Sequence, residues 1–214
     1  MKQFDFFERA GEMSNLPEGL TYQPDLITPA EQDALVSHIS ELPFREFQFH
    51  QFLAKRRTVS FGWHYDYSGA RLQKADPIPE FLLPLRALAA RVAKLEPKDF
   101  QHVLVTEYAP GTGIGWHRDK AVFGEVVGIS LLTPCVLRFR LKENDKWRRA
   151  NVPVEPRSAY HLSGPARTVW EHSILRVDEL RYAITFRNLR PLESGVKPTR
   201  SKAHARAKRN AAIS

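Results

Sequence analysis

The stretch EYAPGTGIGWHRDKAVFGEVVGISLL, residues 107–132, has the pattern of a strand, a glycine-rich turn and a second strand. The second strand carries His117 and Asp119, one residue apart. Alternate residues of a strand point to the same face. We therefore expect an imidazole and a carboxylate to lie side by side, next to glycines that leave room for other groups.

Short strand patterns continue along the chain around this stretch. They are separated by turn residues and cover residues 102–109, 113–119, 126–132, 135–141, 150–162, 168–175 and 180–189. Strands at this spacing are typical of a double-sheet sandwich or a jelly roll.

Two helices are predicted before these strands. Thr28 and Pro29 have the pattern of an N-cap followed by the first helical residue, and an apolar face follows with Leu35, Ile39 and Leu42. A second helix is predicted within residues 77–95. The predicted fold class is α+β, a jelly-roll core with the N-terminal helices packed on one sheet.

The segment between the two helices, residues 56–69, is rich in β-branched and aromatic side chains and predicts a hairpin.

Length and composition suit one domain followed by a tail. The chain has 214 residues, of which 43% are hydrophobic, and a net charge of +8. We expect one domain over residues 1–190 and a flexible basic tail over residues 191–214, which has a net charge of +5 and could contact a polyanion. A solubilising tail without a partner is the alternative. We expect a monomer.

The sequence favours the cytoplasm. Cys135 is the single cysteine, so no disulfide can form within the chain, and a small core residue is its expected role. We find no signal peptide and no apolar run long enough to span a bilayer, so we expect no membrane association.

A third polar residue, His172 in the sequence VWEHSIL, completes a candidate metal site with His117 and Asp119. Two imidazoles and one carboxylate on one face of an iron ion leave coordination positions open, as in non-haem Fe(II) oxygenases. The H-x-D pair alone is weak evidence, because a surface ion pair produces the same pattern. His161 is the rival third ligand, although a structural hydrogen bond is its more ordinary role.

Two arginines, Arg181 and Arg187, are six residues apart on the last predicted strand and so face the same side. Buried arginines are costly unless they meet an anion, and a guanidinium binds a carboxylate in a bidentate fashion. A solvent-facing basic edge is the alternative. We expect one face of this strand to be outside, and the sequence leaves open which one.

Taken in order, YAPG, HRD, ISL, SGPAR, WEHSI and RYAITFR make the chain resemble the AlkB-type Fe(II)/2-oxoglutarate-dependent dioxygenases. The resemblance covers most of residues 20–190. It implies Fe(II) bound by His117, Asp119 and His172, and O₂ and 2-oxoglutarate as co-substrates. It also places Arg181 and Tyr108 on 2-oxoglutarate and Arg187 beside the metal and the substrate.

Two positions depart from the family pattern. Many members have Asn where this chain has Thr106 and Ala183, and both asparagines would help to hold 2-oxoglutarate. Thr106 is still expected to contribute to the co-substrate site, with Arg181 and Tyr108 carrying more of the binding.

A nucleotide-recognition lid over about residues 55–72 is also implied by the resemblance. Its residues Arg57, Trp63, Tyr65 and Tyr67 are expected to contact the substrate. Base chemistry requires a base outside its stack, and aromatic side chains then replace the lost stacking.

The implied activity is oxidative demethylation of N-alkylated bases, such as 1-methyladenine and 3-methylcytosine, in DNA or RNA, with release of formaldehyde and succinate. One alternative is the same chemistry on a tRNA base or on a protein side chain. A nucleic-acid-binding domain without catalysis is a third possibility, against which the intact His/Asp/His set argues.

Overall fold

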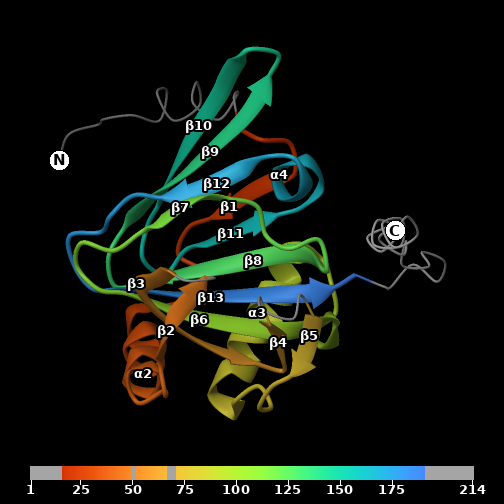
Figure 1. Cartoon of the computed structure of the whole chain (residues 1–214). Coiled ribbons are helices and arrows are strands. Elements are labelled where there is room, and N and C mark those ends of the chain that lie inside the picture. Colours follow the sequence, from red (N-terminus) through yellow and green to blue (C-terminus); the bar gives the residue numbers. More distant parts are fainter. Residues whose placement is uncertain (1–15, 50–51, 67–70, 191–214) are drawn as a thin grey trace, which may run out of the picture.

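The fold is described here from a computed structural model, which covers residues 16–49, 52–66 and 71–190 (Figure 1). The predicted tail over residues 191–214 and the predicted substrate contact Tyr67 lie outside the described residues.

The first helix, α2 (Pro29–Ser40), begins where its capping residues predict. The side chain of Thr28 accepts a hydrogen bond from the backbone N–H of Glu31 at 3.2 Å, and the Glu31 carboxylate accepts one from the backbone N–H of Thr28 at 2.7 Å. This reciprocal pair satisfies two N–H groups that the first turn leaves without helical partners. Leu35 and Ile39 are buried, which confirms the apolar face.

The second helix consists of a short 3₁₀ turn, η1 (Glu80–Leu82), followed by α3 (Leu83–Ala93). It ends at Lys94, whose φ of 58° is a left-handed C-cap conformation. Another 3₁₀ turn, η2 (Pro97–Asp99), leads into the first long core strand.

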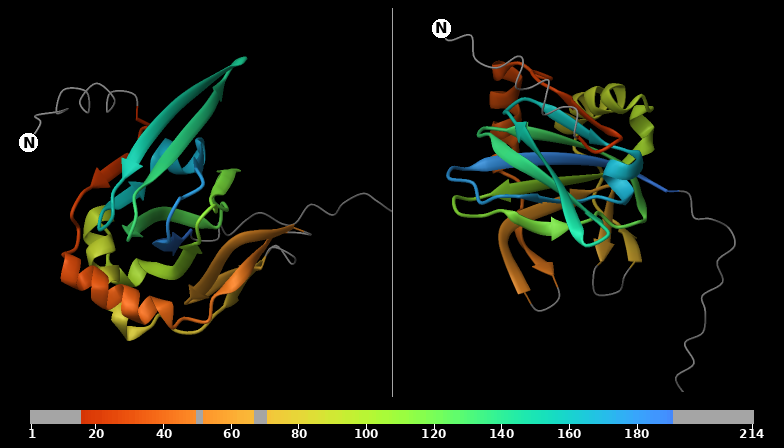
Figure 2. Two further views of the ribbon diagram at one scale, coloured as in Figure 1. Left: turned by 90° about the vertical axis from the view of Figure 1, so that its left-hand side faces the viewer. Right: turned by 90° about the horizontal axis from the view of Figure 1, so that it is seen from above.

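A seven-stranded sheet forms the larger layer, with the order β1-β11-β8-β13-β6-β3-β2. Its strands are β1 (Leu20–Gln23), β2 (Arg45–Phe49), β3 (Phe52–Phe61), β6 (Phe100–Tyr108), β8 (Phe123–Leu131), β11 (Ala159–Leu162) and β13 (Arg181–Leu189). Helices α2 and α3 pack on one face through a single apolar cluster that includes Ile39, Leu85 and Ile184. Figure 2 shows both helices on that side of the molecule.

A four-stranded sheet, in the order β10-β9-β12-β7, covers the other face. Its strands are β7 (Ile114–His117), β9 (Cys135–Glu143), β10 (Lys146–Val154) and β12 (Glu171–Ile174), and a short helix α4 (Gly164–Thr168) precedes β12. A second apolar cluster with Val126, Phe139 and Ala183 fills the space between the sheets. This is the predicted jelly roll with helices on one sheet, and the α+β fold class is confirmed.

Strand β13 is covered on both faces. Tyr182, Ile184 and Phe186 belong to the helix-side cluster, while Ala183 belongs to the cluster between the sheets. The expectation that one face of this strand lies outside is therefore wrong, because a central strand between helices and a second sheet has no solvent face.

Two other predictions about strands are wrong in detail. The described residues 56–66 of this segment do not pair with one another in a hairpin: β3 joins the large sheet beside β6, and β4 (Trp63–Asp66) pairs with β5 (Arg71–Lys74) in a sheet of its own. The single strand predicted over residues 150–162 is two strands, because the chain turns at Arg157, where φ is 63°.

Two glycines of the core allow neighbouring groups to pack closely against the backbone. A Cβ on Gly113 would lie 2.7 Å from the carbonyl oxygen of Ile174, so its absence lets β7 begin directly against β12. A Cβ on Gly128 would lie 2.2 Å from the Tyr160 ring, so the absence of a side chain here lets this tyrosine pack against β8.

Cys135 is buried, as expected. Within the described residues, no helix combines the length and the apolar character that crossing a membrane requires.

Candidate metal centre and pocket

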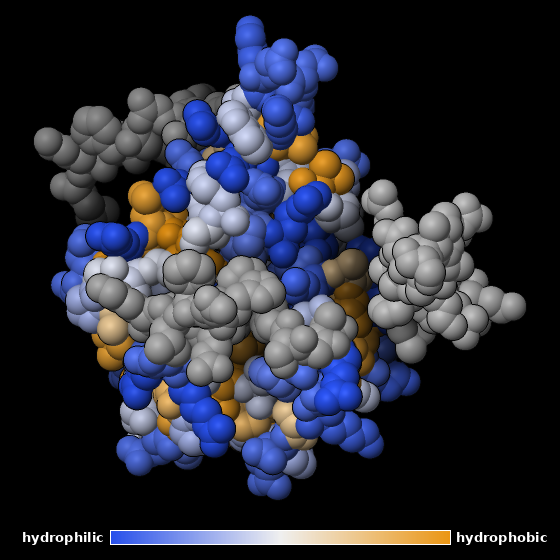
Figure 3. Space-filling model, viewed as in Figure 1, coloured by the Kyte–Doolittle hydropathy of each residue, from blue (hydrophilic) through white to orange (hydrophobic). Residues whose placement is uncertain are grey.

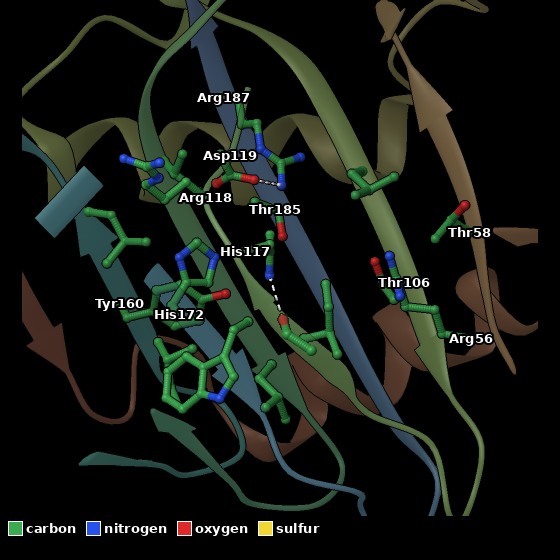
Figure 4. A pocket seen from close by; sticks show the side chains of 18 of the residues that line it. Arg56, Thr58, Thr106, His117, Arg118, Asp119, Tyr160, His172, Thr185 and Arg187 are labelled. Carbon is green, nitrogen blue, oxygen red and sulfur yellow. Dashed lines mark hydrogen bonds and ion pairs between the residues drawn. The ribbon is translucent and has the colours of Figure 1, made fainter. Parts of the chain in front are cut away.

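Three side chains that the sequence singled out converge at one end of the smaller sheet. Antiparallel pairing of β12 with β7 sets His172 directly opposite His117, with ring centroids 4.3 Å apart. One possible ligand atom from each of His117, Asp119 and His172 lies within 4.8 Å of the other two (Figure 4). This spacing fits three donors around a single metal ion.

Asp119 reaches this cluster in a way that the sequence did not predict. Strand β7 ends at His117, so Asp119 lies in the following loop and not on the same strand face. That loop closes with a hydrogen bond from the backbone N–H of Phe123 to the carbonyl of Lys120 at 3.0 Å. The carboxylate of Asp119 therefore lies beside His117 as expected, but the loop brings it there and not the alternation of side chains along one strand.

The tautomer of His117 follows from its neighbour. Its Nδ1 lies 2.9 Å from the backbone carbonyl oxygen of Gly115, and a carbonyl can only accept, so Nδ1–H is the donor. Nε2 is then the unprotonated nitrogen, which is the form in which imidazole binds a metal.

His161, the rival third ligand, lies on β11 and away from the cluster. Its Nε2 is 2.8 Å from a carboxylate oxygen of Glu125, and the residue is buried. His161 therefore makes a structural hydrogen bond, which is the more ordinary role that the sequence suggested for it.

The cluster opens into a cavity of about 520 Å³ between the two sheets. Six of the predicted site residues line it: Thr106, Tyr108, His117, Asp119, His172 and Arg187. Several lining residues had no predicted role, among them Arg56, Thr58, Trp116, Arg118, Lys120, Tyr160 and Thr185. A cavity of this size holds a drug-sized ligand.

Arg187 and Asp119 form a buried ion pair beside the two histidines, with Nη2 3.3 Å from Oδ1. Burial alone would raise the pKa of Asp119. The positive charge of Arg187, together with the two histidines and Arg167, outweighs burial and holds that pKa well below its usual range. The carboxylate therefore stays ionised, as a ligand for a cation must be.

The histidines are held in the neutral form. Burial is the main cause that lowers the pKa of His172 to about 3, and His117 adds to it. Burial likewise lowers the pKa of His117. Because metal binding requires an unprotonated imidazole nitrogen, both rings are ready for it at neutral pH.

Acid should therefore destabilise the metal-free protein. Below about pH 6.5 the unfolded chain protonates His172, while the folded protein keeps it neutral until about pH 3. The unfolded state then binds more protons, so the free energy of unfolding falls with decreasing pH across this window, by up to about 1.4 kcal/mol per pH unit for this residue.

Urea unfolding of metal-free protein at several pH values between about 7.5 and 4.5 measures the slope of the free energy of unfolding against pH. His172→Gln should lower the slope, whereas His38→Gln, on the exposed side of α2, should leave it unchanged. Equal slopes for the wild type and His172→Gln would contradict the assignment.

Arg181 is fully buried behind the cavity wall. Its guanidinium lies 5.1 Å from the ring centroid of Tyr108, and its Nε donates to the hydroxyl of Ser130 at 3.1 Å. Nη1 and Nη2 have no hydrogen-bond partner among the described residues. A pair of unused N–H groups on one guanidinium edge matches the two oxygens of a carboxylate.

The departures from the family pattern lie beside this arginine. Arg181 is opposite Tyr108, and Ala183 is opposite both Thr106 and Ser130 on the neighbouring strands. The sequence assigned no role to Ser130, although its hydroxyl is what orients the guanidinium.

A further residue without a predicted role is Arg167 in α4. Its buried guanidinium donates hydrogen bonds to the backbone carbonyls of Asp119 at 3.3 Å, Lys120 at 2.7 Å and Phe123 at 2.7 Å. The first two carbonyls belong to the loop that carries Asp119, and the third belongs to Phe123, the first residue of β8. The motif SGPAR was the only sequence signal for this contact.

Replacing Arg167 with alanine should therefore loosen the Asp119 loop. We expect a loss of about 3 kcal/mol in the free energy of unfolding, because three charge-assisted hydrogen bonds are lost. Metal affinity should fall by about 10- to 100-fold, as for other residues that orient a ligand. Urea unfolding and titration with Co²⁺ measure the two effects.

Arg176→Ala, which removes a charge from an exposed position, is the control for Arg167→Ala. Unchanged Co²⁺ affinity in Arg167→Ala would show that the loop does not need this contact.

None of the described residues predicted to contact the substrate from the lid lines the cavity. Arg57 does not face the cavity: its Nε and Nη2 bind the Glu107 carboxylate at 2.7 and 2.8 Å. Strand alternation instead directs its neighbour Arg56 to the cavity wall. Of the two arginines, Arg56 is thus the one that lines the cavity, and the contact of Arg57 with the substrate stays a prediction.

The two described aromatic lid residues, Trp63 and Tyr65, lie on β4, and neither lines the cavity. The ammonium group of Lys120, which does line it, lies 5.4 Å from the ring centroid of Tyr65. Tyr65 therefore contacts a cavity-lining residue, Lys120, without lining the cavity itself.

Comparisons with known proteins agree with this arrangement. The family model described as the 2OG-Fe(II) oxygenase superfamily matches residues 19–190. The solved structure titled "The structure of OsALKBH1" superposes with a TM-score of 0.63 at 16% identity, covering 81% of this chain and 98% of that one.

Several relatives whose names state a function are similar over parts of their length. An Arabidopsis thaliana "Alkylated DNA repair protein ALKBH8 homolog" is 24% identical over 87% of this chain and 60% of its own length. The Mus musculus "tRNA (carboxymethyluridine(34)-5-O)-methyltransferase ALKBH8" is 26% identical over 74% of this chain and 24% of its own length. The Danio rerio "Probable RNA/DNA demethylase ALKBH6" is 29% identical over 52% of this chain and 45% of its own length. The chain thus spans less than two thirds of these relatives.

Proposed function

Because the chain belongs to the 2OG-Fe(II) oxygenase superfamily and is a dioxygenase of the AlkB type, we propose that it oxidatively demethylates N-alkylated bases in DNA or RNA. The observation that carries this proposal is the His117/Asp119/His172 cluster on the wall of a 520 Å³ cavity. The family implies Fe(II), 2-oxoglutarate and O₂. Relatives named for DNA repair, for RNA/DNA demethylation and for tRNA modification support a nucleic-acid substrate.

The residues present fit the iron and its co-substrate. His117, Asp119 and His172 would hold the metal on one side, since their possible ligand atoms lie within 4.8 Å of one another. Arg181, with both terminal nitrogens unpaired among the described residues, would hold a carboxylate of 2-oxoglutarate, beside Tyr108 and Thr106. When bound, iron, 2-oxoglutarate and O₂ would supply an oxidant that inserts one oxygen atom of O₂ into a C–H bond, while the other oxygen atom enters succinate as 2-oxoglutarate loses carbon dioxide.

The protein's own contribution is to position the metal ligands and the substrate and to exclude water. Arg187 keeps the Asp119 carboxylate ionised and oriented, and Arg167 holds its loop. The cavity walls at Leu104, Val126, Leu137 and Ile174 present apolar surface to a bound base. An N-hydroxymethyl group formed there breaks down to the free base N–H and formaldehyde.

A second candidate is the same chemistry on an uncharged base of tRNA, and one observation favours it. Among the described residues that line the cavity, Asp119 is the only acid, and it would be bound to the metal. 1-Methyladenine and 3-methylcytosine carry a positive charge at neutral pH. A cationic base would thus enter beside Arg187, Arg118 and Lys120 without a carboxylate of its own.

A panel of oligonucleotides tests both candidates. DNA and RNA strands with 1-methyladenine, 3-methylcytosine or uncharged N6-methyladenine are incubated with Fe(II) and 2-oxoglutarate, as is an unfractionated tRNA pool, and nucleosides are quantified by mass spectrometry. Loss of a methylated nucleoside supports the proposal, and loss of the uncharged one or change in tRNA alone favours the second candidate. No change in any nucleoside would overturn both.

A further inference from the structure

The outward face of the smaller sheet carries arginines and tryptophans in a continuous array. Leu137, Phe139, Ala150 and Val152 point into the core, so alternation turns their neighbours on β9 and β10 outward. We call this surface the outer Trp/Arg face; it consists of Trp116, Arg138, Arg140, Lys142, Trp147 and Arg149. Figure 1 shows that β9 and β10 extend beyond the rest of the sheet.

Arg140 is fixed at the centre of this face. Its guanidinium lies 4.5 Å from the ring centroid of Trp116 and 4.4 Å from that of Trp147. Its Nε also donates to the Glu171 carboxylate at 2.6 Å. Arg138 lies 4.9 Å from the Trp116 ring and donates to the hydroxyl of Ser173 at 3.1 Å. The array is therefore held in place before any ligand arrives.

Three properties of the face suit a surface that binds an anionic ligand. Trp147 is 41% exposed although the guanidinium of Arg140 packs on its ring. Arg149 is directly opposite Arg140 on the paired strand, and like charges in that position are destabilising. Glu171 is the only acid at the outward positions of these four strands, all of which the structure describes.

The face is continuous with the cavity. Trp116 packs against Arg138 and Arg140 on this face and also lines the cavity, one residue before His117. At the far end, the tip of the β9–β10 hairpin is strongly hydrophilic (Figure 3). A chain that leaves the cavity past Trp116 would run along the arginines toward Trp147.

We propose that the outer Trp/Arg face binds single-stranded nucleic acid that flanks the base held in the cavity. Exposed indoles give bases a surface on which to stack, and arginines between them give phosphates a counter-charge. A base would stack on Trp147, and phosphates would meet Arg149, Lys142 and Arg138. This inference rests on the proposed function insofar as the substrate is a nucleic acid.

The test separates stacking from charge. Binding of the full chain to unmethylated single-stranded oligonucleotides of about twelve nucleotides is measured by fluorescence anisotropy at several salt concentrations. Trp147→Ala should weaken binding about tenfold without changing the salt dependence, and Trp147→Phe should restore most of the affinity. Arg149→Ala should lower the slope of log K against log salt by about 0.7, the value for one phosphate contact on a single strand.

Arg91→Ala on α3 is the matched control, because it removes the same charge from an exposed position on the helix side of the molecule. Parallel DNA and RNA arms of one sequence show which strand the face prefers.

Each outcome separates the inference from the proposed function. If the wild type binds oligonucleotides but Trp147→Ala and Arg149→Ala behave like Arg91→Ala, the inference is overturned and the proposed function is untouched. If the two face variants weaken binding as expected but no methylated nucleoside is consumed, the face stands and the proposed function fails. A wild type that binds no oligonucleotide at all overturns the inference.

Discussion

Asp119→Ala is expected to abolish the conversion of 2-oxoglutarate to succinate, with a fall in rate of more than about 100-fold. Asp119 supplies the only carboxylate of the cluster, and even residues that merely orient a ligand cost 10–100-fold when removed. The substitution also leaves Arg187 buried without its partner, because Asp119 is the carboxylate that it binds.

Succinate formation and Co²⁺ titration measure this effect together. Asp178→Ala, which removes the same charge from an exposed position, should match the wild type in both. The oligonucleotide affinity of Asp119→Ala should remain, because the outer Trp/Arg face does not include the cluster. An Asp119→Ala protein that still binds Co²⁺ as tightly as the wild type would contradict the assignment of this carboxylate as a ligand.

Replacing Arg181 with methionine is expected to have two effects of opposite sign. The response to 2-oxoglutarate should disappear, with an affinity loss of about 100-fold, because two charge-assisted hydrogen bonds are lost. The ligand-free protein should become more stable, by about 1–3 kcal/mol. Arg181 is a fully buried cation with no acidic partner among the described residues, and apolar replacement of buried charge is often stabilising.

Thermal unfolding with and without 2-oxoglutarate, in the presence of Mn²⁺, shows both effects in one experiment. The wild type should gain stability on adding 2-oxoglutarate, and Arg181→Met should start higher and gain none. Arg181→Lys keeps the charge and loses the planar fork, so it should retain only a small part of the gain. A full response to 2-oxoglutarate in Arg181→Met would remove this arginine from the co-substrate site.

Much of the fold could be predicted because local signals and tertiary structure agree. Thr28 and Pro29 mark the start of α2, and the alternating pattern of Arg181–Leu189 marks a core strand. The pattern of residues 56–69 predicted the wrong partners, because nothing in a strand's own sequence states which strand lies beside it. β3 pairs with β6, whose partner residues come 42 to 50 positions later in the chain, from Phe61↔Val103 to Arg57↔Glu107.

The candidate site was predictable where residue type and spacing carry the chemistry. His117, Asp119 and His172 were identified by ligand type and order, and the structure brings them together. Arg57 pairs with Glu107 and does not line the cavity, because adjacent strand residues face opposite sides and the sequence does not state which side is the cavity; its contact with the substrate stays a prediction.

Arg167 and Ser130 were missed for a different reason. Arg167 acts through the backbone carbonyls of a loop, and Ser130 acts through the side chain of Arg181. A backbone carbonyl has no sequence signature, and the Ser130 contact joins strands that are far apart in the chain.

The measurement that tests the account most directly is the stoichiometry of succinate and formaldehyde in one reaction. Wild-type protein is incubated with Fe(II), 2-oxoglutarate and the methylated oligonucleotide or tRNA that it consumes best, and both products are quantified over time. The account predicts equal amounts of the two products, and neither product with Asp119→Ala. Succinate without formaldehyde on every nucleic acid offered would contradict the demethylase function, and formaldehyde that persists in Asp119→Ala would contradict the proposed metal centre.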